Sequence, residues 1–175
     1  MAVNNGYSIP QVYLTGISYE TAPLPVREKL SISKARINDA LINLNRYVNK
    51  GVILATCNRT EVYTVGDESS TESSLRDFMC RWSGLSQEQL APHLHMSQGH
   101  DAVSHLTETA AGLRSMIVGE WEIQGQVRQA LKYAEAAGMV DAPLRKLFQH
   151  AVRVGRRVRD ETDISKNALS VSSGR

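Results

Sequence analysis

The stretch Gly51-Val-Ile-Leu-Ala-Thr-Cys57-Asn-Arg-Thr-Glu61-Val-Tyr-Thr-Val65 decides how the first part of the chain folds. Residues 52–55 form a continuous apolar run, which predicts a buried strand, and residues 61–65 alternate as a returning strand. The two strands predict a hairpin with Cys57 at its turn. Reactive groups often lie on such connecting segments, because a rigid scaffold holds the segment in place.

Cys57 is a candidate nucleophile, because a thiolate attacks carbonyls and esters and the neighbouring guanidinium of Arg59 favours the anion. Arg59 can instead hold a substrate carboxylate through a two-pronged hydrogen bond, and the two roles are compatible. Taken alone, residues 56–61 favour another interpretation, in which Cys57 is a small buried hydrophobic residue.

The rest of the first half mixes short strands with short helices. Pro23 and Pro25 interrupt the chain, and a serine at position 31 or 33 can cap the helix that follows. The sequence predicts strands at residues 11–17 and around 93–96, a helical turn at 26–30, and helices at 34–47 and from about Ser73.

From Asp101 onward the apolar spacing is helical, Gly138 is a stop signal, and Pro143 suits the first turn of a last helix that runs to about Thr162. These elements predict an α+β fold, a small sheet-and-helix sandwich with an appended helical subdomain and a long C-terminal helix.

Composition places the chain among ordinary globular proteins. It has 175 residues, of which 42% are hydrophobic and 22% charged, and a net charge of +2. No apolar run approaches the roughly 18 residues of a membrane helix, and no signal pattern opens the chain. We therefore expect a cytoplasmic protein without membrane contact, in which both cysteines, Cys57 and Cys80, stay reduced.

The sequence contains neither a metal-ligand motif nor a dinucleotide-binding motif. His93, His95, His100 and His105 have no partner motif with metal-ligand spacing, so we expect no metal site. No Gly-x-Gly-x-x-Gly follows a predicted strand, so we expect no dinucleotide site in this chain.

Positive charge is concentrated in the last predicted helix, where residues 143–159 contain no acid but include Arg145, Lys146, Arg153, Arg156, Arg157 and Arg159. Such a face can contact RNA phosphates. It can equally be a solvated helix face, or pair with the acidic surface of another domain.

Several separated blocks share the order and spacing of one known family. Residues 16–23 and 27–30 open the series, residues 56–61 follow, and His105, Ser115 and residues 119–127 form the longest motif. Residues 147–151, 155–159 and 170–173 complete it. In this respect the chain resembles glutamyl-tRNA reductases. It departs from the family pattern at Tyr19, Arg114, Trp121, Glu122 and Gln124.

The resemblance implies the N-terminal catalytic domain of such an enzyme plus the start of its connecting helix. On that basis residues 1–142 are the catalytic, glutamyl-recognition domain, and residues 143–164 are a long connecting, or spinal, helix. Residues 165–175 are then a flexible tail at the entry to an NADPH-binding domain that lies outside this chain.

The activity implied by the resemblance begins with attack of Cys57 on the ester of glutamyl-tRNA, which gives a thioester and releases the tRNA. NADPH then reduces the thioester to glutamate-1-semialdehyde, the first step of five-carbon tetrapyrrole (porphyrin) biosynthesis. This chain alone is expected to reach only acyl transfer and ester hydrolysis. The expected partners are glutamyl-tRNA, a second copy in a full-length homodimer, and glutamate-1-semialdehyde aminomutase as the recipient of the product.

The resemblance also selects the site residues. Cys57 and His105 are the expected catalytic residues, and Arg59 is expected to hold the substrate carboxylate. The other expected substrate contacts are Thr56, Asn58, Ser115, Glu120, Trp121, Glu122 and Gln126. Residue type alone gives simpler interpretations: a buried core histidine, an acid at a helix N-terminus for Glu120, and a packing role for Trp121.

Two other functions stay open on the sequence. One is a noncatalytic tRNA-binding or regulatory module with the same fold, which would use the basic helix. The other is a thiol hydrolase of small esters, for which no ordered Cys, His and acid set is visible.

Overall fold

The computed structural model describes residues 11–66, 70–164 and 166. An antiparallel sheet lies at its centre, with strands in the order β2-β3-β1-β4. The strands are β1 (Gln11–Ser18), β2 (Val52–Ala55), β3 (Arg59–Gly66) and β4 (His95–Gln98). β2 and β4 are therefore the edges of the sheet.

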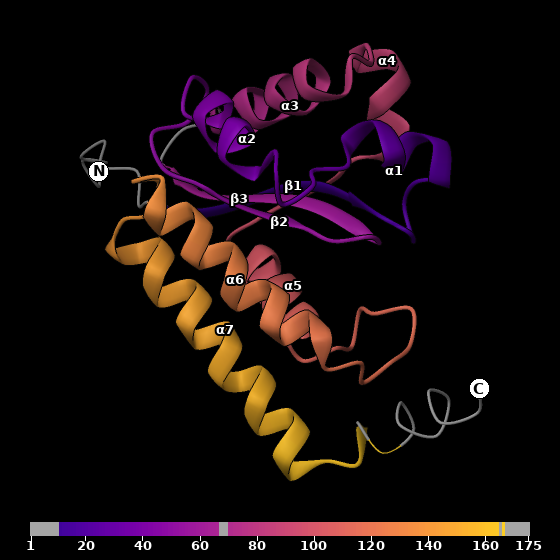
Figure 1. The fold of residues 1–175 in the computed structure, drawn as a ribbon, viewed down its shortest axis with the longest axis vertical. Helices are drawn as coiled ribbons and strands as arrows, with labels where there is room; N and C mark the ends of the chain where they lie inside the picture. Colours follow the sequence, from indigo (N-terminus) through magenta and orange to yellow (C-terminus); the bar gives the residue numbers. More distant parts are fainter. Residues whose placement is uncertain (1–10, 67–69, 165, 167–175) are drawn as a thin grey trace, which may run out of the picture.

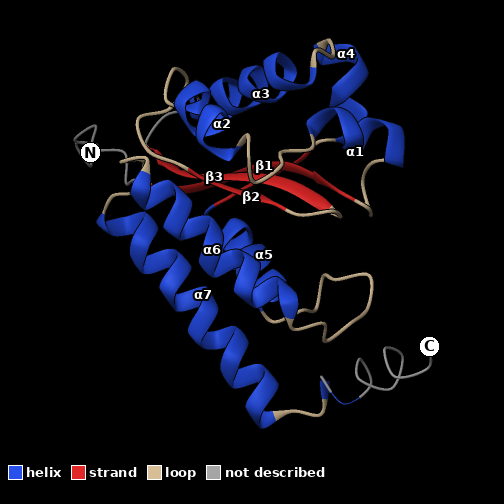
Figure 2. Cartoon of the chain, in the orientation of Figure 1, coloured by secondary structure: helices blue, strands red, loops and turns tan. Residues whose placement is uncertain are grey.

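Helices cover both faces of this sheet, so that the described chain forms three layers (Figures 1 and 2). One face carries α1 (Leu24–Leu30), α2 (Ile37–Leu44), α3 (Ser70–Ser83) and α4 (Gln87–Leu90), which a short 3-10 turn follows at Ala91–His93. The other face carries α5 (Gly99–Ala110), α6 (Glu122–Ala136) and α7 (Ala142–Glu161). α7 extends well beyond the sheet (Figure 1).

The two central strands are buried on both faces, because each face of the sheet has its own layer of helices. Six consecutive residues of β1, from Tyr13 to Ser18, are buried, and the first six residues of β3 are buried as well. On the α7 side, Tyr63 packs edge-on against Phe148, with ring centroids 5.5 Å apart. Such pairs stabilise a core beyond the area they bury.

Local signals explain the last two helices. α6 ends before Gly138, whose φ of 70° suits glycine. α7 then begins with an Asp141 side chain that accepts a hydrogen bond from the Leu144 backbone N–H at 3.0 Å, with Pro143 in the first turn. Leu144, Phe148 and other apolar residues of one stripe face α5 and α6.

The α+β class, the hairpin and the long last helix are confirmed, and the differences are local. The predicted helix at residues 34–47 is limited to α2, whose Ile37, Ala40, Leu41 and Leu44 reach the core, and the flanking residues form turns. The strand expected at 93–96 begins instead at His95, after the 3-10 turn that contains Pro92. The predicted flexible tail at 165–175 lies outside the described residues, except for position 166.

We predict that Gly155 sets how closely α7 can approach α5. An added Cβ at Gly155 would lie 2.7 Å from the Ala110 carbonyl oxygen, so Gly155→Ala forces the helices apart and is expected to cost about 2 kcal/mol of unfolding free energy. Gly125→Ala is the matched control, because its Cβ meets nothing within 4 Å and it lies in α6. The control is expected to stabilise by about 0.5–1 kcal/mol in chemical denaturation. Equal effects of the two substitutions would contradict this packing argument.

Candidate active site

The turn between β2 and β3 holds Cys57 at its tip. The Thr56 N–H donates to the Arg59 carbonyl at 2.8 Å, and the Asn58 N–H donates to the Thr56 hydroxyl at 3.2 Å. The turn is also tied to its surroundings, since the Tyr19 N–H donates to the Asn58 carbonyl at 2.9 Å and the Arg27 guanidinium to the Cys57 carbonyl at 3.4 Å. These bonds engage backbone and Thr56 oxygens and leave the exposed Cys57 thiol free.

Cys57 lines a small hollow beside α1, which we call the thiol hollow. Its wall consists of Ile17, Leu24, Arg27, Glu28, Ser31, Thr56, Cys57, Arg59 and Thr60. The hollow therefore combines an accessible thiol with cationic, anionic and hydroxyl side chains. The interpretation of Cys57 as a buried hydrophobic residue is wrong, because the residue is exposed.

Polar side chains of β3 form a buried cluster with His105 of α5. Arg59, Glu61 and Tyr63 alternate along the strand and therefore point to the same face, toward α5 and α7. Glu61 is only 2% exposed, and its Oε1 accepts from Arg59 Nη1 at 2.8 Å and lies 2.8 Å from His105 Nε2. Its Oε2 accepts from the Tyr63 hydroxyl at 2.7 Å. We call these four residues the Glu61 cluster.

Arg59 links the Glu61 cluster to the thiol hollow. It is 4% exposed, and besides Glu61 it donates to the Thr109 hydroxyl at 3.4 Å and to the Arg114 carbonyl at 2.5 Å. These contacts use three of the five N–H donors of a guanidinium. The guanidinium is held in place by Glu61 and the Arg114 carbonyl, and the residue also forms part of the wall around Cys57.

The cluster shifts two pKa values in opposite directions. Burial raises the pKa of Glu61, but the hydrogen bond from His105 and the charge of Arg59 outweigh it, and the net pKa lies below its ordinary value. Burial and the adjacent Glu61 carboxylate raise the pKa of Tyr63 well above its ordinary value. Glu61 is therefore a carboxylate at neutral pH, and Tyr63 is a neutral donor to it.

His105 belongs to the same cluster and not to the thiol hollow. It is 6% exposed, and its ring stacks on His95 of β4 with centroids 4.9 Å apart. Burial and the nearby His105 lower the pKa of His95. A second hollow is lined by His105 and His95 together with Glu61, Glu20 and Arg114, and His105 Nδ1 has no hydrogen-bond partner within the described part of the chain.

The loop from Gly112 to Trp121, between α5 and α6, carries three more predicted site residues. Gly112 and Gly119 have φ of 80° and 86°, and the Gly119 N–H donates to the Gly112 carbonyl at 3.1 Å, which closes the loop. Ser115 is buried directly after the Arg114 carbonyl that Arg59 holds, Glu120 is half-buried, and Trp121 is 62% exposed. The loop also exposes Leu113, Met116, Ile117 and Val118.

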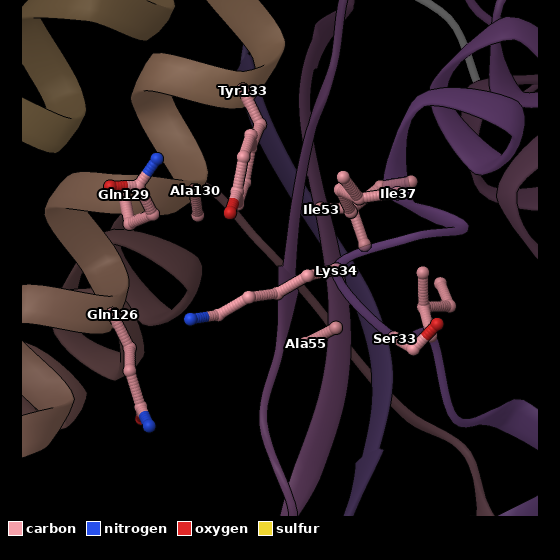
Figure 3. Close-up of a pocket in the computed structure, with 10 residues that line it drawn as sticks. Ser33, Lys34, Ile37, Ile53, Ala55, Gln126, Gln129, Ala130 and Tyr133 are labelled. Atoms are coloured by element: carbon pink, nitrogen blue, oxygen red, sulfur yellow. The ribbon is translucent and has the colours of Figure 1, made fainter.

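Glu122 and Gln126 come from the first turns of α6. Glu122 is exposed at the start of the helix, where an acid suits the helix dipole. Gln126 lines a groove along β2 that Figure 3 shows, in the company of Lys34, Ala55 and Tyr133. The structure therefore separates the predicted site residues: Thr56, Cys57 and Arg59 line the thiol hollow, His105 the second hollow and Gln126 this groove. The other predicted residues line none of the three, namely Asn58, Ser115, Glu120, Trp121 and Glu122.

Sequence reasoning missed Glu61 and Tyr63 as partners of the site, and it missed His95. The signal was present: an arginine, an acid and a tyrosine two residues apart in one strand must share a face. Among the described residues, no three His, Cys, Asp or Glu side chains are grouped so that they could hold a metal ion. In the same part of the chain, no helix is long and apolar enough to span a bilayer.

Fold and site together define a class of α+β domain in which a turn of an antiparallel sheet presents an accessible cysteine beside a fixed arginine. Comparison with known proteins narrows that class. Residues 15–162 match the family model described as the N-terminal domain of glutamyl-tRNAGlu reductase, and the chain belongs to this family.

Individual relatives agree with the family model. The chain is 43% identical to glutamyl-tRNA reductase of Carboxydothermus hydrogenoformans over 162 residues and 38% identical to that of Bacillus subtilis over 164 residues, which is 91% and 92% of this chain. It spans only 36% of each relative. The solved structure of glutamyl-tRNA reductase from Methanopyrus kandleri superposes with a TM-score of 0.73 at 30% identity, over 88% of this chain and 35% of that one.

We predict that Glu61→Gln destabilises the fold by about 3 kcal/mol, because Arg59 then stays buried without a counter-charge. Glu108→Gln is the control: it removes a carboxylate that also pairs with an arginine, Arg114, at 2.7 Å, but that pair is partly exposed and is expected to contribute less than about 1 kcal/mol. Urea denaturation of wild type, Glu61→Gln and Glu108→Gln at pH 7 measures the loss of unfolding free energy in each variant. Similar losses in the two variants would show that burial of the Glu61 pair does not matter.

The same pair predicts a pH dependence. The folded pKa of Glu61 lies below its ordinary value of 4.5, so its stabilising contribution is complete above that pH and is lost as pH falls through the folded pKa. The difference in unfolding free energy between wild type and Glu61→Gln should therefore be constant near neutral pH and shrink below about pH 4.5. Denaturation curves between pH 3 and 7 check this; a difference that grows on acidification contradicts it.

Proposed function

We propose that this chain performs the acyl-transfer half of a glutamyl-tRNA reductase reaction, with Cys57 as the nucleophile. The observation that carries the proposal is the exposed Cys57 thiol in a hollow whose wall includes the cationic residues Arg27 and Arg59. Membership of the family supports the choice of substrate, glutamate esterified to its tRNA. The relatives are named glutamyl-tRNA reductases, and this chain corresponds to about a third of their length.

In the proposed step, the Cys57 thiolate forms a bond to the ester carbonyl carbon. The bond from that carbon to the ribose oxygen breaks, and the ribose takes up a proton and leaves with the tRNA. The product on the protein is a glutamyl thioester. An activated ester needs less assistance than an amide, so an accessible thiol beside a positive charge is adequate for this chemistry.

Glutamate is recognised by its two charged groups. We assign the side-chain carboxylate to Arg59, which lines the thiol hollow and keeps two N–H donors that its described contacts do not use. Glu28 lines the same wall and offers a carboxylate to the α-ammonium group. We assign neutral hydrogen bonds to Thr56 and Asn58. Further substrate contacts are assigned on the family resemblance to Ser115, Glu120, Trp121, Glu122 and Gln126.

His105 acts in this scheme through Arg59, because it shares the Glu61 Oε1 atom with that residue. Fixing Glu61 fixes the guanidinium, and the guanidinium in turn fixes the substrate carboxylate. His105 is therefore a positioning residue in this proposal, and Cys57 is the group that forms the covalent bond.

NADPH is the cofactor that the family resemblance implies. It supplies a hydride that converts a thioester to an aldehyde. A dinucleotide binds where parallel strands meet helices at a glycine-rich turn, and the sheet in the described residues is antiparallel throughout. These residues therefore do not fit the cofactor, and the acylation step proposed for this chain does not use it. The division at residue 142, the connecting role of α7, the homodimer and the handover to an aminomutase belong to the same proposal.

A noncatalytic tRNA-binding module is the alternative, and the exposed arginines of α7 favour it. Arg153 and Arg156 are exposed and make no ion pair with described residues, whereas Arg157 pairs with Glu161 at 3.1 Å. Binding by such a face would depend on salt and on Arg156, Arg157 and Arg159, and it would be independent of Cys57.

We predict that incubation with glutamyl-tRNA adds one glutamyl group to the chain, measured by intact mass under acidic quench. Cys57→Ser should lose the adduct, because the alcohol is a much weaker nucleophile at neutral pH. Cys80→Ser, which changes the half-buried cysteine of α3, should keep it.

A different result would contradict the acylation of Cys57. An unmodified protein with intact glutamyl-tRNA, together with salt-dependent tRNA binding that persists in Cys57→Ser, would replace the catalytic proposal with the binding module.

A further inference from the structure

A groove runs along β2, the edge strand of the sheet, between α6 and the segment that connects α1 to α2. Figure 3 shows the Lys34 side chain reaching across it from that segment toward α6, where Gln126 and Gln129 lie. The complete lining is Ile32, Ser33, Lys34, Ile37, Ile53, Ala55, Gln126, Gln129, Ala130 and Tyr133. We call it the Lys34 groove.

The Lys34 groove continues the thiol hollow along two chain segments. In the connecting segment, Ser31 lines the thiol hollow and Ile32 begins the groove. At the end of β2, Ala55 lines the groove, and Thr56 and Cys57 line the thiol hollow. Ala55 and Cys57 are two residues apart, which is about 7 Å at most along an extended chain.

The chemistry of the groove is selective. Lys34 is the one lining residue that is charged at neutral pH, and its ammonium group makes no ion pair with any described residue. Isoleucine and alanine side chains form an apolar floor, and Tyr133 adds an aromatic ring. Gln126 and Gln129 add amides that can both donate and accept hydrogen bonds. A ligand with a flat apolar ring, polar ring edges and one negative charge matches this lining.

We infer that the Lys34 groove binds the 3′-terminal nucleotide of the charged RNA. The inference rests on the proposed function, because it assumes that the acyl group enters the thiol hollow. The 5′ phosphate of that nucleotide pairs with the Lys34 ammonium group. Its base lies on the apolar floor beside Tyr133, within reach of the Gln126 and Gln129 amides.

Geometry favours this nucleotide over other parts of the RNA. The oxygen that Cys57 displaces belongs to the terminal ribose, so that ribose must stand beside the thiol when the bond forms. Its base and 5′ phosphate are then within one nucleotide of Cys57, and the adjoining groove begins two residues away at Ala55. A groove with acidic lining would repel the phosphate, and this one contains no acid.

The test uses the 175-residue chain and two small ester substrates, glutamyl adenosine and glutamyl adenosine 5′-monophosphate, each acylated on a ribose hydroxyl. Acylation of Cys57 is followed by intact mass. Lys34→Gln should slow acylation by the monophosphate about fivefold, the effect of one partly exposed ion pair, and leave acylation by the nucleoside unchanged. Lys132→Gln is the matched control, because it removes the same charge from α6 outside the groove lining and should alter neither rate.

Glutamyl-tRNA provides a second readout. For single-stranded ends, the slope of log affinity against log salt changes by about 0.7 for each lost phosphate contact, so Lys34→Gln should flatten the salt dependence by about that amount. A purely structural role of Lys34 would not alter the slope.

The two proposals fail in different ways. If no substrate acylates Cys57, the proposed function is wrong. If wild type and Lys34→Gln acylate equally fast with the monophosphate, the function stands and the nucleotide site is wrong, which is also the result expected if the groove holds the cofactor's nucleotide instead. An equal loss with both small substrates would place the Lys34 effect at Cys57 itself and overturn the inference.

Discussion

The buried carboxylate of Glu61 is the constraint on which the site depends. A carboxylate removed from water is stable only if charged and hydrogen-bonding partners replace the water, and here Arg59, His105 and Tyr63 do so. These partners come from β3 and α5, so the charge also joins the sheet to its helical layer. Gly16 makes room for this arrangement: it faces Glu61 across the sheet, and a Cβ there would lie 2.7 Å from the Glu61 Cγ.

Holding Arg59 in this way has a consequence for the proposed chemistry. A free arginine would lose much side-chain entropy on binding a substrate carboxylate, whereas one already fixed by Glu61 and the Arg114 carbonyl has lost it on folding. The α5–α6 loop takes part through that carbonyl, which links the position of Ser115 to the same guanidinium. The thiol lies on the turn, outside these constraints, and stays accessible.

The sequence was sufficient to predict the features that depend on residues close together in the chain. The apolar run at residues 52–55, the alternation that follows and the stripe of α7 each predict their element directly, and Cys57 at the turn follows from them. Features that join distant segments were not visible. The contact of Glu61 with His105 spans 44 positions, and the loop closure by Gly112 and Gly119 requires positive φ at both, which glycine permits but does not demand.

The division of the site into adjoining hollows follows from the layered fold. At the β2–β3 turn, the α1–α2 connection reaches the sheet from one layer and α6 from the other, and the edge strand β2 lies between them. The proposed substrate, a small acyl group on a large carrier, would use this separation, because the acyl group enters a hollow while the carrier stays outside. An enclosed site at the centre of the sheet would admit glutamate alone. An edge site admits the ester bond with its ribose, so an accessible thiol on an edge turn suits the carrier-bound substrate proposed above.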